Sequence, residues 1–133
     1  MDGDTYDVTE VAATPGLDLK VDFVSVTKFT HVQVVAYYTG STASHAISIQ
    51  LYDWQRSAWD TFNSMQGDGV VMHDYSFFVP CPANYIGTGS DAGDVRVRLN
   101  HTMLGDVTHD VYVDVVALYD RDWKVDHHWG PWR

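Results

Sequence analysis

The residues best suited to chemistry are aromatic side chains gathered around one predicted hairpin. Trp54 falls in a predicted tight turn, and Tyr52, Arg56 and Trp59 lie close to it in sequence. Flat rings beside guanidinium and amide groups suit sugars, because a sugar ring has apolar C–H faces and a polar rim. Trp, Tyr and Arg also dominate the energetics of protein interfaces. The sequence therefore predicts a binding site for a glycan or a protein at Tyr52, Trp54, Arg56 and Trp59. The alternative is ordinary packing inside the domain.

A second candidate is Asp114, which lies within a valine-rich predicted strand. A carboxylate buried there without a partner would be costly. Calcium prefers carboxylate and carbonyl oxygens, so one interpretation is a structural calcium ion held by Asp114 and by oxygens of the N-terminal segment. The alternative is an Asp114 that faces solvent or a neighbouring hydrogen-bond donor.

Two histidines, His101 and His109, flank the loop at 102–108. A hairpin would place their imidazoles opposite one another, where they could share a transition metal or form a pH-sensitive pair. Two histidines alone make an incomplete metal site, so we expect hydrogen bonding at the surface instead.

Three tryptophans lie in the C-terminal segment 120–133, which shows no strand periodicity. Large aromatic side chains are not left bare on a soluble monomer, so they either fold back on the domain or dock into a partner. Because charged residues begin this segment, we expect docking into a partner through Trp123, Trp129 and Trp132.

Signals for catalysis are weak. The sequence has no nucleophile elbow, phosphate-binding loop or HExxH motif. Cys81 stands between two prolines without a histidine near it in sequence, so an inert thiol is expected. Scattered aspartates could pair as acid and base, but turn formation and solvation explain most of them. We therefore expect a protein that is not an enzyme.

The composition excludes several other classes. The chain has 133 residues, which fits one domain. Its 18 acidic and 8 basic residues give a net charge of −10, which argues against a nucleic-acid partner. No apolar run is long enough for a membrane span, and the N-terminal residues lack the pattern of a signal peptide. Many aspartates and few lysines would suit a salty medium.

The elements that must position these residues are strands. Val and Thr are frequent whereas Leu and Lys are scarce, and apolar and polar residues alternate along several segments. The expected fold is a single antiparallel β-sandwich of about seven or eight strands, of jelly-roll type. Its domain spans 17–119, between a short N-terminal arm at 1–16 and the Trp-rich tail at 120–133. The predicted strands are 17–23, 29–38, 45–53, 58–65, 70–79, 94–101 and 109–119.

In the last of these strands, strict alternation places Val111, Val113, Val115 and Ala117 on one face.

Two stretches of the chain resemble segments of β-sandwich domains in tailed-bacteriophage virion proteins. They are HAISIQLYDWQRSAWDTF at 45–62 and VRVRLNHTMLGDVTHDVYVDVVAL at 95–118. With the strand at 29–40, the resemblance covers roughly residues 17–119. The second stretch resembles a closing hairpin with an arginine, two histidines around a glycine turn, and an aspartate in the last strand. These positions are Arg98, His101, Gly105, His109 and Asp114.

The resemblance implies a non-enzymatic structural protein of the virion, with a fold like that of carbohydrate-binding modules. Such domains occur in tail fibres, baseplates, capsid fibres and decoration proteins. The implied partners are other virion proteins and a host cell-surface glycan, and threefold symmetry of fibres and capsid sites suggests a homotrimer. In related carbohydrate-binding modules, an aspartate of the final strand helps to hold calcium, and Asp114 matches that position. The alternative is a soluble carbohydrate-binding module, with or without structural calcium.

Overall fold

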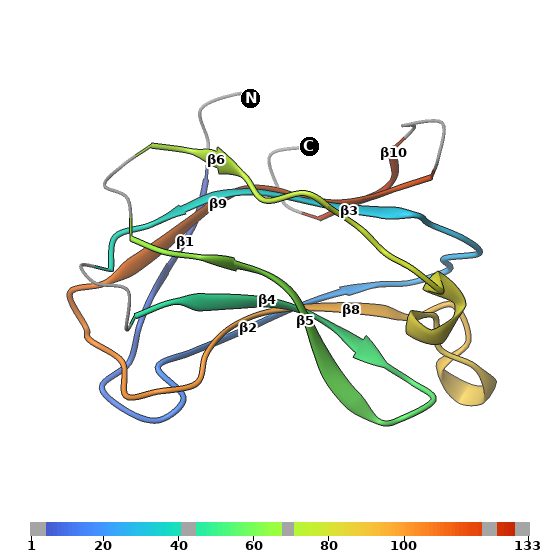
Figure 1. The fold of residues 1–133 in the computed structure, drawn as a ribbon, viewed down its shortest axis with the longest axis horizontal. Coiled ribbons are helices and arrows are strands. Elements are labelled where there is room, and N and C mark those ends of the chain that lie inside the picture. The colour runs from blue at the N-terminus through green and yellow to red at the C-terminus, as the bar shows by residue number, and fades with distance from the viewer. Residues whose placement is uncertain (1–4, 41–44, 68–70, 121–124, 130–133) are drawn as a thin grey trace.

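The fold consists of two antiparallel sheets packed face to face, as the sequence predicts (Figure 1). The computed structural model describes residues 5–40, 45–67, 71–120 and 125–129. Among these residues, none of the helices has the length and apolar character needed to cross a membrane. The protein is therefore an all-β sandwich, and the jelly-roll topology within that class stays a prediction.

Sheet A forms one layer and sheet B the other. In sheet A the strand order is β1 (Tyr6–Thr9), β9 (Asp110–Tyr119), β3 (His31–Tyr38) and β6 (His73–Asp74), while β10 (Val125–Trp129) also pairs with β9 and β7 (Phe77–Phe78) with β3. In sheet B the order is β2 (Leu17–Phe23), β8 (Val95–His101), β4 (Ile47–Asp53) and β5 (Ala58–Met65). Two short 3-10 helices, η1 (Pro82–Tyr85) and η2 (Gly89–Asp91), lie between β7 and β8.

The core follows from alternation, because successive side chains of a strand point to opposite faces. In β3 and β4 every second residue is fully buried, and the residues between them are mostly half-buried. The buried residues of these two strands that face the core are Val32, Val34, Ala36, Tyr38, Ile47, Ile49 and Leu51. This is the pattern that the sequence predicts for both strands.

Strand β9 departs from strict alternation. The register between β3 and β9 shifts at Asp114, which is an extra residue on β9 and forms a bulge. The bulge reverses which residues face inward, so the expectation that Val115 and Ala117 continue the inward face is wrong. The residues of β9 that belong to the core are Val111, Val113, Val116 and Leu118.

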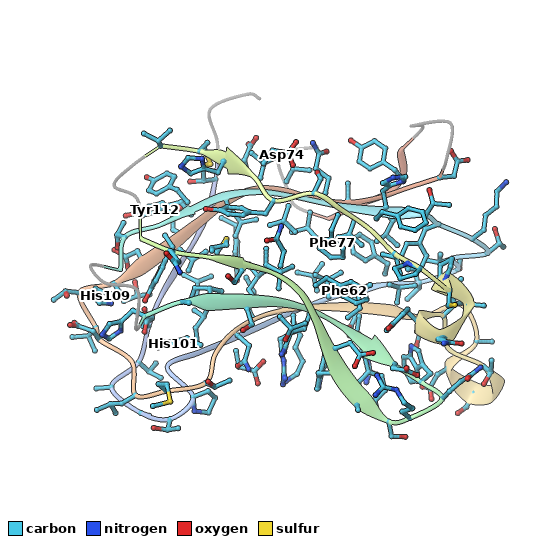
Figure 2. All side chains as sticks on the ribbon, viewed as in Figure 1. Phe62, Asp74, Phe77, His101, His109 and Tyr112 are labelled. Atoms are coloured by element: carbon cyan, nitrogen blue, oxygen red, sulfur yellow. The ribbon has the colours of Figure 1, made fainter. Side chains whose placement is uncertain are left out.

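A second register shift, between β4 and β5, lies next to Phe62. Phe62 stacks on Phe77 of β7, with ring centroids 5.1 Å apart and planes within 6° of parallel. This contact joins an edge strand of sheet B to sheet A, as Figure 2 shows between the two layers.

Both terminal segments contribute strands that the sequence did not indicate. The segment predicted as an N-terminal arm contains β1, and the segment predicted as an irregular tail contains β10. Both strands pair with β9, β1 along its first half and β10 along its second half. Each segment is therefore held by backbone hydrogen bonds to a strand that is already buried, which no side-chain periodicity reveals.

Candidate functional site

The predicted aromatic residues meet on the outer face of sheet B. Tyr52 in β4 lies opposite Trp59 in β5, and their rings contact each other edge to face with centroids 5.1 Å apart. Trp54, in the turn after β4, contacts Tyr52 in the same manner at 5.0 Å. All three side chains are half-buried, so part of each ring stays accessible to a ligand.

Two arginines of β8 complete this face. The Arg98 guanidinium lies 4.2 Å from the ring centroid of Trp59, and that of Arg96 lies 4.8 Å from the centroid of Trp54. Both distances are within the range of cation–π attraction. Burial lowers the pKa of Arg98, and its Nε donates a 2.8 Å hydrogen bond to Oε1 of Gln50. We call Tyr52, Trp54, Trp59, Arg96 and Arg98 the aromatic–arginine face.

Sequence reasoning missed both arginines of this face. Their alternation in β8 was visible, and it indicates that Arg96 and Arg98 share one side of a strand. What the sequence could not reveal is that β8 lies next to β4, because that neighbour is set by the order of strands in the sheet.

Arg56 does not join the aromatic rings. Its Nε donates a 2.9 Å hydrogen bond to Oδ2 of Asp53, and its Nη2 donates to the carboxylate of Asp60. The Tyr85 hydroxyl also donates to Asp60, at 2.7 Å. Asp60 follows Trp59 in β5, so these two side chains leave the strand on opposite faces. Arg56 therefore fixes the β4–β5 turn and lies apart from the aromatic–arginine face.

The charges of this turn shift the pKa values of its titratable groups. The hydrogen bond from Arg56 lowers the pKa of Asp53, and hydrogen bonds from Arg56 and Tyr85 lower the pKa of Asp60. Burial and the hydrogen bond to Asp60 raise the pKa of Tyr85 to about 12. The two carboxylates are thus ionised at neutral pH, and both pair with Arg56 in the turn that carries Trp54.

Asp114, the predicted calcium ligand, is almost fully buried. Its side chain is 1 % exposed, and its Oδ2 has no hydrogen-bond partner among the described residues. Tyr6 of β1 pairs with Val113, so the backbone of the predicted arm runs beside the residue that precedes Asp114. The solvent-facing alternative is wrong, and calcium binding at Asp114 stays a prediction.

A second cluster surrounds Glu10, the one glutamate of the chain. Its residues His101 and His109 lie at the opposite end of the sandwich from the β4–β5 turn (Figures 1 and 2). Glu10 is 1 % exposed, although it lies in the predicted arm. Its Oε1 accepts hydrogen bonds from His101 Nδ1 at 2.7 Å and from the Asp106 backbone N–H at 3.3 Å. Its Oε2 accepts a hydrogen bond from the Tyr38 hydroxyl.

The histidines around Glu10 come from different elements. His101 ends β8 and His109 directly precedes β9, so the two flank the connection between the sheets and not a hairpin (Figure 2). They are 2 % and 6 % exposed, so the expectation of a surface role is wrong. His45, before β4, contacts both imidazoles, with ring centroids 5.3 Å from His101 and 4.9 Å from His109.

This cluster has the donor set of a metal site. Glu10, His45 and His109 each offer one ligand atom, and these atoms lie within 4.8 Å of one another. Burial and the hydrogen bond to Glu10 raise the pKa of Tyr38, so its hydroxyl remains a hydrogen-bond donor at neutral pH. The signal in the sequence was the isolated glutamate among aspartates, which was visible but pointed to no partner.

Two glycines allow the loop 102–108 to close over Glu10. A Cβ on Gly105 would lie 2.2 Å from the Val11 carbonyl oxygen, and a Cβ on Gly16 would lie 2.5 Å from the Gly105 Cα. The Gly105 N–H donates a 3.0 Å hydrogen bond to the carbonyl of Ala13. The absence of side chains at both positions thus lets two backbones meet above the buried carboxylate.

The predicted docking residues of the tail are only partly described. Trp129 lies in β10, where its backbone pairs with Val116 of β9. Trp123 and Trp132 lie outside the described residues. Docking of all three into a partner stays a prediction.

A shallow open depression lies at the far end of β5 from Trp59. It is lined by Ser64, Gln66, Gly67, His73 and Tyr75. None of these residues belongs to the aromatic–arginine face or to the Glu10 cluster.

No protein-family model, curated protein or solved structure matches the chain.

Proposed function

We propose that the protein is a non-enzymatic binding module of a phage virion, which attaches to a host-surface glycan through the aromatic–arginine face. The virion part rests on the resemblance of residues 45–62 and 95–118 to phage β-sandwich domains. The glycan part rests on one observation, the packing of Tyr52, Trp54 and Trp59 against two guanidinium groups on the outer face of sheet B.

The chemistry of that face suits a sugar. Half-buried rings offer flat apolar surface for C–H groups, and edge-to-face packing holds the rings so that little side-chain entropy is lost on binding. Arg98 and Gln50 add polar groups next to Trp59. An ion pair between Arg96 and Asp22, at 3.5 Å, limits the positive charge of the face. Such a surface can bind sugar hydroxyls as well as sugar carboxylates.

The strand order supports the jelly-roll part of the proposal. Along the chain, β1 and β3 lie in sheet A whereas β2 and β4 lie in sheet B. After the β4–β5 hairpin within sheet B, the chain again alternates between the sheets, with β6 and β7 in sheet A, β8 in sheet B and β9 in sheet A. This order is the one expected of a jelly roll, in which the chain winds two Greek keys into one sandwich.

A glycan array followed by calorimetry with host cell-surface polysaccharide tests the glycan part. We expect the wild type to bind, and Trp54→Ala and Trp59→Ala each to weaken binding at least about tenfold, which corresponds to about 1.4 kcal/mol. Tyr37→Ala is the matched control, because Tyr37 stacks on Tyr112 on sheet A. Blank results for the wild type in both measurements would remove the glycan part.

Electron microscopy of native particles, labelled with an antibody to this protein, tests the virion part. Label on a capsid or tail is the expected result. Free protein without label on particles would favour the alternative, a soluble carbohydrate-binding module that uses the same face.

We further propose the homotrimer that the resemblance suggests, and light scattering tests it. A mass equal to one chain over a wide concentration range would overturn it.

Docking of the C-terminal tail into other virion proteins is best tested with substitutions outside β10. Because β10 pairs with β9, deleting residues 120–133 would remove part of sheet A and confuse docking with folding. Trp123→Ala and Trp132→Ala lie outside β10. If the tail docks into other virion proteins, both variants should lower incorporation into particles; unchanged incorporation would count against docking.

A further inference from the structure

Glu10, His45 and His109 come from three parts of the chain, and each carries an atom of a type that can ligate a metal. Glu10 follows β1, His45 precedes β4 of sheet B, and His109 precedes β9 of sheet A. Their ligand atoms lie within 4.8 Å of one another. Two imidazoles and one carboxylate suit zinc and its neighbours in the first transition series, whereas calcium and magnesium favour sets of oxygens alone.

Two groups of the cluster would each be satisfied by a bound cation. His45 Nδ1 is buried and has no hydrogen-bond partner among the described residues. Glu10 is buried beside it, and its carboxylate is shared among Tyr38, His101 and His109. A buried carboxylate beside an unsatisfied imidazole nitrogen is costly, and a bound cation would satisfy both groups.

We propose that Glu10, His45 and His109 bind one divalent transition-metal ion, for which Zn²⁺ is the probe. Ligand atoms around a tetrahedral zinc ion lie roughly 3.4 Å apart, since each is about 2.0–2.1 Å from the metal. The site therefore closes slightly on binding. His45 is the residue best able to move, because it is half-buried whereas Glu10 and His109 are buried.

The groups behind these ligands hold them in place. His101 and the Asp106 N–H fix Oε1 of Glu10, and the Tyr38 hydroxyl donates to its Oε2. The Asp106 carboxylate lies 3.7 Å from Nε2 of His109. Such outer partners orient metal ligands and raise their basicity. His101, Tyr38 and Asp106 are thus positioning residues of the site.

The consequence of metal binding is a cross-link between the layers. One ion would tie the segment after β1 to the start of β4 and the start of β9, and so join both sheets at one end of the sandwich. His45 and Trp54 flank β4 at opposite ends, which places them roughly 25–30 Å apart along the strand direction. The site is therefore independent of the aromatic–arginine face.

Metal content and thermal stability test this proposal on the full chain. Protein stripped with a chelator should take up one equivalent of Zn²⁺, measured by calorimetry and elemental analysis after dialysis, and its Tm should rise. In His45→Ala the affinity should fall by at least roughly tenfold to a hundredfold, and the rise in Tm should disappear. His73→Ala, the same change outside the cluster, should behave like the wild type.

A second variant removes His127 and His128, which are adjacent in the sequence and could bind a metal independently of the Glu10 cluster. The variant His127→Ala/His128→Ala should still bind one equivalent, and Co²⁺ in the same site should show the intense visible absorption of a tetrahedral centre. Circular dichroism of stripped His45→Ala establishes that it is folded; if it is not, His45→Gln replaces it. No uptake by the wild type, or equal uptake by the wild type and the folded His45 variant, would overturn the proposal.

Discussion

Arg56 bridges two carboxylates of one turn, so its contribution to stability depends on pH. The pKa values of Asp53 and Asp60 are lower in the folded protein than their ordinary value of 3.8. As pH falls, the unfolded chain therefore takes up protons before the folded one. The ion pairs stabilise the fold above about pH 4, and this stabilisation is lost as pH falls through the lowered pKa values.

We therefore expect the Tm of the wild type to fall more steeply below about pH 4 than the Tm of Arg56→Gln. Thermal unfolding followed by circular dichroism at a series of pH values measures both. Lys28→Gln is the control, because Lys28 is exposed and its loss changes net charge equally. Parallel curves for the wild type and Arg56→Gln would contradict the role assigned to this turn.

Asp114 is the residue predicted to bind structural calcium. Its Oδ2 has no hydrogen-bond partner among the described residues, so stabilisation by calcium should depend on this side chain. If calcium binds there, a concentration of about 100 times its Kd stabilises the wild type by about 2.7 kcal/mol. Asp114→Asn should remove that effect of calcium, whereas Asp74→Asn, at an exposed position, should keep it. Equal calcium responses of the wild type and Asp114→Asn would exclude the site, and Zn²⁺ uptake at Glu10 should be unchanged in both variants.

Among single residues, those close in sequence were predictable and those brought together by the fold were not. Tyr52, Trp54 and Trp59 lie in one hairpin, so their proximity follows from a local turn. Glu10 and His101 are 91 positions apart and hydrogen-bond across the end of the sandwich. Such pairs depend on strand order and loop closure, and neither leaves a periodic signal in the sequence.

At the scale of elements, alternation predicted most strands because most of them are buried on one face. Strands β2, β5 and β8 were predicted with bounds that agree within a residue. The bulge at Asp114 was not predicted, since both faces of β9 are apolar beyond it and alternation carries no register there. Strands β1 and β10 escaped detection because they are held by backbone pairing with β9.

The loop 102–108 depends on a glycine contact that a single methyl group should break. In Gly105→Ala the new Cβ would lie 2.2 Å from the Val11 carbonyl oxygen and 2.6 Å from the Gly16 Cα, so backbone must move. We expect a loss of about 2–3 kcal/mol in the free energy of unfolding, measured with urea. Zn²⁺ affinity should also fall, because Asp106 and His109 would shift with the loop.

The control for this substitution is Gly89→Ala. Gly89 has a φ of 62° and no atom within 4 Å of an added Cβ. Its replacement therefore costs only the left-handed backbone conformation, about 1 kcal/mol. If Gly105→Ala were no more destabilising than Gly89→Ala, the backbone contact would not be what holds the loop closed.

At the scale of the whole molecule, the aromatic–arginine face and the Glu10 cluster occupy different parts of the sandwich. The outer face of sheet B carries rings from β4, the β4–β5 turn and β5, next to guanidinium groups from β8. The Glu10 cluster lies where the loops between sheets meet, at the other end of β4. A metal ion at one end of the sandwich would therefore leave the aromatic–arginine face unaltered, and each proposed site can be tested with the other intact.

Net charge is the property of the whole chain that makes stability depend on salt. With a net charge of −10, the folded protein concentrates repelling carboxylates that the expanded chain keeps apart. The screening length falls from about 10 Å at 0.1 M salt to about 3 Å at 1 M, so added NaCl should relieve this repulsion. Screening also weakens ion pairs such as Arg56–Asp60, but the excess of 18 acidic over 8 basic residues makes repulsion the larger effect.

We therefore expect the Tm at neutral pH to rise steadily as NaCl is raised from low concentration to about 1 M. Near the isoelectric point of about 4.7 the net charge vanishes, so the same salt series should change the Tm much less. Thermal unfolding at the two pH values separates charge screening from general effects of salt on apolar burial, because only screening depends on net charge. A Tm that stays level or falls with NaCl at neutral pH would mean that local ion pairs outweigh the repulsion of the whole molecule.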